Sequence, residues 1–123
     1  MVERPVKWGE LGFITFARTY ARKKFGGSLE TFSETVEREL NGIDKQLKCK
    51  FTEEDKEFYR KMRHEMKGSV AGRFMWQLGT KTVDQLGLSS LQNCAFTVID
   101  EPIRPFTWAM DMLMVGSGKK ITC

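Results

Sequence analysis

The chain has 123 residues, of which 41% are hydrophobic, enough for one domain with a modest core. Its 20 Lys and Arg and 16 Asp and Glu residues give a net charge of +4, an excess too small and too interspersed to indicate a nucleic-acid partner. Three widely spaced cysteines and a single histidine exclude a structural zinc site, so we expect no metal. They favour a reduced cytoplasmic compartment over a disulfide scaffold.

No segment predicts contact with a membrane. The longest uncharged run, residues 85–99, has 15 residues and is interrupted by glycine and polar side chains, so it is too short to span a bilayer. The first residues include Glu3, Arg4 and Lys7 and lack the apolar stretch of a signal peptide. We therefore expect a cytoplasmic protein with no membrane partner.

The first predicted element is an amphipathic helix that begins near Trp8. Apolar residues recur along it at helical spacing: Phe13, Phe16, Ala17 and Tyr20. Basic residues at 22–24 suit a helix C-terminus, and the glycines at 26–27 predict the end of the helix.

The second predicted helix begins near Ser28, with Glu30 in its first turn. Its expected buried side is an apolar stripe at helical spacing: Phe32, Val36, Leu40, Ile43 and Leu47. Its expected solvated side is charged: Glu34, Glu37, Arg38 and Glu39.

A third helix is predicted to start at Thr52, whose hydroxyl can cap the amide of Asp55. Its expected buried positions are Phe58, Tyr59, Met62 and Met66. His64 lies among charged residues, which predicts an exposed side chain without a metal or catalytic role.

Small residues dominate segment 68–73. Ser69 can offer a hydroxyl and backbone amides to an anion, with Arg73 as a charged partner. The same composition is typical of an ordinary turn. Both interpretations stay open on the residues alone.

Cys94 lies where a small, polar stretch enters a predicted strand. Phe96, Val98 and Ile99 have the β-branched and aromatic character of a buried strand. A thiol held by rigid backbone at this point can react, whereas a free cysteine in a core strand is typically a small buried hydrophobe.

A turn at residues 100–105 precedes the last predicted helix, which ends at residues 116–118. Its expected buried stripe is Ile103, Phe106, Met110, Leu113 and Met114. The methionines at 110, 112 and 114 are expected to fill the core.

Four sequence blocks, spaced along the chain, resemble blocks of a known enzyme family. They are segment 8–22, Ala-Gly-Arg-Phe-Met-Trp at 71–76 with Gly79-Thr80, Leu-Gln-Asn-Cys-Ala-Phe at 91–96, and Met-Leu-Met-Val-Gly-Ser-Gly at 112–118. In this order, over residues 6–118, the chain resembles the N-terminal part of the monomeric adenosylcobalamin-dependent (class II) ribonucleoside-triphosphate reductases. Members of that family are several times longer.

The resemblance implies a mainly α fold in this fragment and an α/β fold in the complete enzyme. Residues 1–68 would form an N-terminal helical lobe. Residues 69–118 would start the reductase barrel, with the first strand and following helix of a ten-stranded α/β barrel. Residues 119–123 would be a tail that departs from the family.

The resemblance also implies a site. Cys94 would be catalytic, as one of two thiols that reduce the ribose 2′ position and end as a disulfide. Ser69 would bind the substrate near its phosphates, and Asn93 would lie near the nucleotide. The implied cofactor is adenosylcobalamin, most of whose site would lie outside this chain. The implied partners are a ribonucleoside triphosphate, the remaining C-terminal part of the reductase and a thioredoxin-type reductant.

Residues 119–123 do not continue the glycine-rich turn of that family. The resemblance implies that the cysteine carrying the thiyl radical, the second reducing cysteine and most of the cobalamin site lie beyond this chain, so we expect the fragment to be inactive alone. A split gene, an intervening element or truncation would each account for this. Two other functions stay open. One is a non-catalytic helical docking module for a separately encoded reductase barrel. The other is a small basic nucleic-acid-binding domain, against which the interspersed acidic residues argue.

Overall fold

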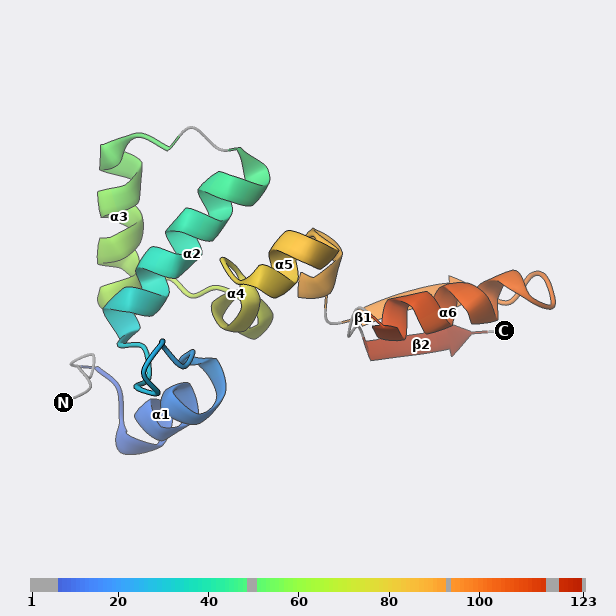
Figure 1. Cartoon of the computed structure of the whole chain (residues 1–123), viewed down its shortest axis with the longest axis horizontal. Coiled ribbons are helices and arrows are strands. Elements are labelled where there is room, and N and C mark those ends of the chain that lie inside the picture. The colour runs from blue at the N-terminus through green and yellow to red at the C-terminus, as the bar shows by residue number, and fades with distance from the viewer. Residues whose placement is uncertain (1–6, 49–50, 93, 115–117, 123) are drawn as a thin grey trace. The chain divides into compact units, whose positions relative to one another are not determined.

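The computed structural model describes residues 7–48, 51–92, 94–114 and 118–122, with the backbone alone at Leu47, Met114 and 118–122. Cys49, Asn93 and Cys123 lie outside the described residues. The chain divides into two compact units, Met1–Thr80 and Lys81–Cys123, here called the first and second unit. The described part is mainly helical, as predicted (Figure 1).

The first helix is shorter than predicted. α1 (Glu10–Thr15) continues into a π-helical turn, η1 (Phe16–Tyr20), and the helix ends there. The chain then folds back, with the Glu30 amide donating to the Arg22 carbonyl at 2.9 Å. The glycines at 26–27 have φ of 105° and 86°, so they form the tip of this hairpin. The predicted extension of the helix to these glycines is wrong.

α2 (Phe32–Leu47) begins later than the predicted start near Ser28. The Glu34 amide donates to the Thr31 hydroxyl, and the Thr31 amide donates to the Glu34 carboxylate at 2.7 Å. This capping box sets the start of the helix, because it satisfies two amides that have no partner within the helix.

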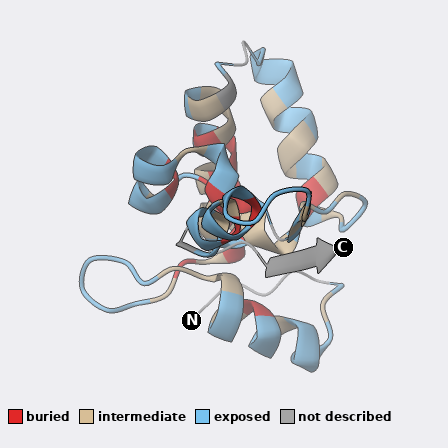
Figure 2. Ribbon diagram, turned by 90° about the vertical axis from the view of Figure 1, so that its right-hand side faces the viewer, coloured by how far each residue is buried: buried red, intermediate tan, exposed pale blue. Residues whose placement is uncertain are grey.

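The core of the first unit lies between α2, η1 and α4 (Gly72–Gln77). The predicted stripe of α2 is confirmed at Phe32, Val36 and Leu40, which are all buried. The Phe32 ring packs edge-on against Phe16, with ring centroids 5.6 Å apart, and Met75 of α4 completes the cluster. Buried positions such as these are red in Figure 2.

The predicted solvated face of α2 is wrong at two positions. Glu39 is completely buried and pairs with Arg63 of α3 (Glu53–His64) at 3.0 Å. Arg38 pairs with Glu30 at 2.9 Å, and these two side chains are 12% and 11% exposed. Each charge lies inside the lobe because an oppositely charged, hydrogen-bonded partner offsets its loss of water.

α3 begins as predicted. The Asp55 amide donates to the Thr52 hydroxyl at 3.2 Å, and the Thr52 amide donates to the Asp55 carboxylate at 2.9 Å. His64 is exposed at the last turn, as expected for a residue without a buried role.

Two predicted buried positions of α3 are wrong. Phe58 is 65% exposed, and Met66 lies beyond the helix with φ of 58° and 39% exposure. Tyr59 and Arg63, four residues apart on one side of the helix, face α2 instead. The buried side of α3 is therefore largely polar.

The second unit contains a short parallel β–α–β segment. After α5 (Lys81–Leu86) and η2 (Leu88–Leu91), strand β1 (Cys94–Val98) leads to α6 (Arg104–Met114) and β2 (Gly118–Thr122). The strands pair in parallel, with Cys94 opposite Gly118 and Val98 opposite Thr122. The predicted strand start at Cys94 is confirmed. Residues 118–122, most of them in the predicted tail, form the second strand.

The sides of β1 and α6 differ from the prediction. Phe96 and Val98 are 72% and 54% exposed, so the strand is not buried on both faces. The predicted buried stripe of the last helix is also exposed to solvent. Met110 is 66% exposed instead of filling the core, and the other described residues of the stripe are exposed as well: Ile103, Phe106 and Leu113. The buried residues are Pro105 and Ala109. Because α6 is apolar on both sides, its pattern alone did not identify the side that packs on the strands.

Candidate functional site

Cys94 is the first residue of β1, and its side chain is exposed. Successive side chains of a strand point to opposite faces, so Cys94 shares one face with Phe96 and Val98. The other face carries the half-buried Ala95 and Thr97, and it is the face covered by α6. The thiol therefore lies on the open face of the β–α–β segment. A thiol in this position is accessible to a substrate or to a second thiol.

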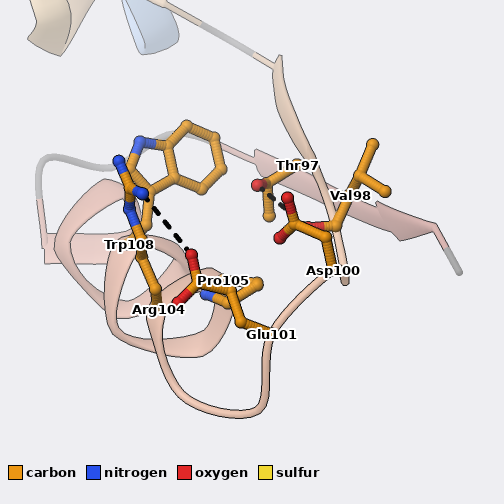
Figure 3. Close-up of a pocket in the computed structure, with 7 residues that line it drawn as sticks. All are labelled: Thr97, Val98, Asp100, Glu101, Arg104, Pro105 and Trp108. Atoms are coloured by element: carbon orange, nitrogen blue, oxygen red, sulfur yellow. Dashed lines mark hydrogen bonds and ion pairs between the residues drawn. The ribbon is translucent and has the colours of Figure 1, made fainter.

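A polar pocket lies at the other end of β1, where the strand leads into α6 (Figure 3). Its volume is about 420 Å³. Arg104 forms an ion pair with Glu101 at 3.4 Å on its rim. The lining residues are Thr97, Val98, Asp100, Glu101, Arg104, Pro105 and Trp108. The sequence predicted only a turn in this segment, although two adjacent acidic residues at 100–101 could have indicated a polar site.

The pocket and the thiol are separate features of the second unit. Cys94 and Val98 stand at opposite ends of a five-residue strand, about 13 Å apart at the usual rise per residue. Cys94 is not among the residues that line the pocket. The Cys94 thiol therefore does not face this pocket.

Ser69 lies in the segment between α3 and α4, and its side chain is exposed. Its hydroxyl donates only a local hydrogen bond among those described, to the Val70 carbonyl at 3.2 Å. The residues around it are held more firmly. The Gly68 amide donates to the Met62 carbonyl at 3.1 Å, and Val70 packs against the core.

The end of this segment is closely packed. A Cβ added to Gly72 would lie 2.9 Å from the hydroxyl oxygen of Tyr20. Residues 68–72 thus present one exposed hydroxyl from a backbone that is fixed on both sides. Ser69 belongs to the first unit and Cys94 to the second.

A buried polar cluster adjoins the Ser69 segment. The Arg63 guanidinium donates from Nε and Nη2 to the two oxygens of Glu39, at 3.1 and 3.0 Å. Its Nη1 donates to the Gly68 carbonyl at 3.3 Å. The Tyr59 hydroxyl donates to Glu39 Oε2 at 2.7 Å. Sequence reasoning missed this cluster, since charged residues on helices are usually solvated.

Burial raises the pKa of Tyr59 far above its usual value, and the charge of Glu39 raises it further. The hydroxyl therefore keeps its proton and remains a donor to Glu39 at any physiological pH. Together with Arg63 it fixes the carboxylate of Glu39 from two sides.

Within the described part of the chain, no cluster of three or more His, Cys, Asp or Glu side chains is arranged to hold a metal ion. Across the same residues, no helix combines the length and apolar character needed to cross a membrane.

Comparisons with known proteins identify the family. The model of the family described as "Ribonucleotide reductase alpha domain" matches residues 1–80, which is 80 of the 123 residues. The chain therefore belongs to the ribonucleotide reductase alpha domain family.

Curated relatives carry a more specific name. Proteins named adenosylcobalamin-dependent ribonucleoside-triphosphate reductase match from Euglena gracilis, at 31% identity over 93% of this chain, and from Lactobacillus leichmannii, at 32% over 90%. A third, from Lactobacillus acidophilus, is 31% identical over 90% of the chain. The chain spans only 18 to 19% of the length of these relatives. No solved structure matches it.

Proposed function

We propose that this chain supplies the N-terminal part of an adenosylcobalamin-dependent ribonucleoside-triphosphate reductase, with Cys94 as one of its two reducing thiols. The observation that carries the proposal is the exposed Cys94 thiol on the open face of β1, in a chain of the ribonucleotide reductase family. The names of the relatives supply the substrate class and the cofactor of the proposed reaction.

The reaction requires two electrons and two protons at the ribose. The bond from the 2′ carbon to its hydroxyl oxygen breaks, a carbon–hydrogen bond forms in its place, and the oxygen leaves as water. Two thiols become a disulfide and supply both electrons and both protons. Cys94 is one of these thiols, and the second comes from a part of the enzyme outside this chain. A thioredoxin-type dithiol then reduces the disulfide for the next turnover.

Substrate binding is assigned to two further residues. Ser69 offers an exposed hydroxyl from a fixed backbone segment, which suits a contact with the phosphates. Asn93 precedes the thiol in the chain, and its backbone is proposed to lie beside the nucleotide.

Strand β1 and helix α6 are proposed to be the first strand and following helix of a ten-stranded α/β barrel. Most of β2, residues 119–122, belongs to the tail predicted to depart from the family. Parallel sheets are normally covered on both faces, and here α6 covers only one. The remaining C-terminal part of the reductase would supply the other strands and the second thiol.

Adenosylcobalamin, when bound, supplies the radical that starts the reaction. Most of its site is proposed to lie outside this chain, in the remaining C-terminal part of the enzyme.

The test is thiol protection in the complete reductase, assembled from this chain and the remaining C-terminal part. One round of nucleotide reduction without external reductant should protect Cys94 from alkylation and leave Cys49 open. Cys94→Ser should stop multiple turnover while nucleotide still binds. If the serine variant keeps turning over, Cys94 is not a reducing thiol and the docking-module function takes its place.

A further inference from the structure

We propose that Arg63 is a positioning residue, which holds segment 68–71 and with it Ser69 in the geometry needed to receive the substrate phosphates. This inference rests on the proposed contact between Ser69 and the substrate phosphates. It goes further by naming the buried side chain that holds the backbone next to Ser69. Arg63 itself touches no substrate, since its side chain is only 3% exposed.

The geometry of Arg63 joins three parts of the first unit. The residue lies on α3, it pairs through Nε and Nη2 with Glu39 of α2, and through Nη1 it reaches the Gly68 carbonyl. The guanidinium also lies over the Phe32 ring, with its central carbon 5.4 Å from the ring centroid. The carbonyl of the residue directly before Ser69 is thus tied to the buried core of the lobe.

Only arginine can make this set of contacts. Its planar guanidinium carries five donors in a rigid fork, so two can pair with a carboxylate while a third points elsewhere. A lysine ammonium can neutralise Glu39, but it cannot hold both carboxylate oxygens and the Gly68 carbonyl in one plane. The completely buried Glu39, fixed by Tyr59 as well, gives the guanidinium a single orientation.

The other anchors of the segment do not act on Ser69 in the same way. The Gly68 amide is held by the Met62 carbonyl, and Val70 is held by the core. Loss of the Arg63 contact therefore frees the carbonyl group of Gly68, which belongs to the peptide unit shared with Ser69. The change would loosen Ser69 without removing its hydroxyl.

Arg60 provides a matched control. It lies one turn earlier on α3 and also pairs with a glutamate of α2, since its Nε and Nη2 donate to the two oxygens of Glu37 at 2.6 and 3.0 Å. No described contact of Arg60 reaches segment 68–71. Arg63→Lys and Arg60→Lys therefore make the same chemical change in two helix-to-helix ion pairs. The Arg60 pair is the more exposed of the two, and only the Arg63 pair holds the segment.

The first measurement uses the chain as it is. In Arg63→Lys, nitrogen relaxation should show increased motion at Ser69 and Val70. Arg60→Lys should leave these signals as in the unchanged chain. Equal behaviour of the two variants would overturn the proposal.

A second variant covers the case in which Arg63→Lys does not fold. Glu39→Leu combined with Arg63→Met replaces the buried ion pair by apolar side chains, a change that proteins often tolerate. It removes the contact to Gly68, so it should loosen Ser69 in the same way. An unchanged Ser69 in this folded variant would also overturn the proposal.

The second measurement uses the complete reductase. Arg63→Lys should raise KM for the triphosphate about tenfold, no more than the loss of the whole hydrogen bond from Ser69 to a charged group would cause, with kcat nearly unchanged. In a Ser69→Ala background, Arg63→Lys should have no further effect on KM. An additive effect would show that Arg63 acts by another route. If Ser69→Ala alone leaves KM unchanged, the phosphate contact fails, and the relaxation result still decides whether Arg63 holds the segment.

Discussion

Gly42 of α2 and Gly79 at the end of the α4 segment approach each other so closely that neither position has room for a side chain. A Cβ on Gly42 would lie 2.6 Å from the Gly79 nitrogen, and a Cβ on Gly79 would lie 2.5 Å from the Arg38 carbonyl oxygen. Gly79 also has φ of 77°, which disfavours any other residue. This contact sets how closely α2 approaches the chain that leaves α4.

Gly42→Ala tests this approach, because two effects of opposite sign compete at the position. Replacing glycine by alanine inside a helix usually stabilises by about 0.5–1 kcal/mol. Here the added methyl meets backbone atoms that cannot rotate away, and overpacking costs about 1–3 kcal/mol. We expect net destabilisation in urea unfolding. Gly12→Ala, inside α1 and with only an ordinary contact of 4.0 Å to the Trp8 ring, should not destabilise the chain, and a stabilised Gly42→Ala would contradict the close approach.

Arg38→Met should lower the free energy of unfolding by about 3–5 kcal/mol, the usual cost of breaking a buried pair. The variant leaves the Glu30 carboxylate without its cationic partner. It also leaves the carbonyls of Met75 and Leu78 without the guanidinium that donates to them at 2.8 and 2.6 Å. Arg60→Met breaks a more exposed pair and should cost less than about 1 kcal/mol. If the two variants lose similar amounts of unfolding free energy, burial does not decide how much these ion pairs contribute to stability.

Glu34 makes the stability of the lobe depend on pH. The hydrogen bond from Lys24, at 2.8 Å, and that from the Thr31 amide hold the pKa of Glu34 below its ordinary value of 4.5. Because its pKa is lower in the folded state, ionised Glu34 stabilises the fold at pH values above 4.5. This stabilisation is lost as the pH falls through the folded-state pKa. The unchanged chain should therefore be more stable than Glu34→Gln at pH 7, and it should lose that advantage progressively as the pH falls below 4.5. The free energy of unfolding in urea is measured for both chains as a function of pH. A difference between them that does not change with pH would contradict the prediction.

Ser69→Ala should raise KM for the triphosphate in the complete reductase by a factor that corresponds to about 1.5–3 kcal/mol, the usual value of a hydrogen bond to a charged group. The exposed Ser28, in the hairpin of the first unit, supplies a control, and Ser28→Ala should leave KM unchanged. If neither KM nor kcat responds to the loss of the Ser69 hydroxyl, this residue lies outside the substrate site.

Local patterns were sufficient where the decisive contacts are close in sequence. The capping box at Thr52 joins residues three positions apart, and the apolar spacing of Phe32, Val36 and Leu40 defines one side of a helix in any tertiary context. The change of composition at Cys94 likewise marks the start of β1, and the spaced blocks around it pointed to the family.

The tertiary structure decided which charges are buried and which apolar residues are not. Glu39 reads as a solvated residue of α2, and it is buried because Arg63, 24 positions away, pairs with it. Phe58 reads as core and is exposed, because Tyr59 and Arg63 occupy the side of α3 that faces α2. Side-chain spacing identifies the two sides of a helix, but the partner that covers one of them comes from distant parts of the chain. The link from Arg63 to the segment of Ser69 depends on such a partner and therefore emerged only from the folded lobe.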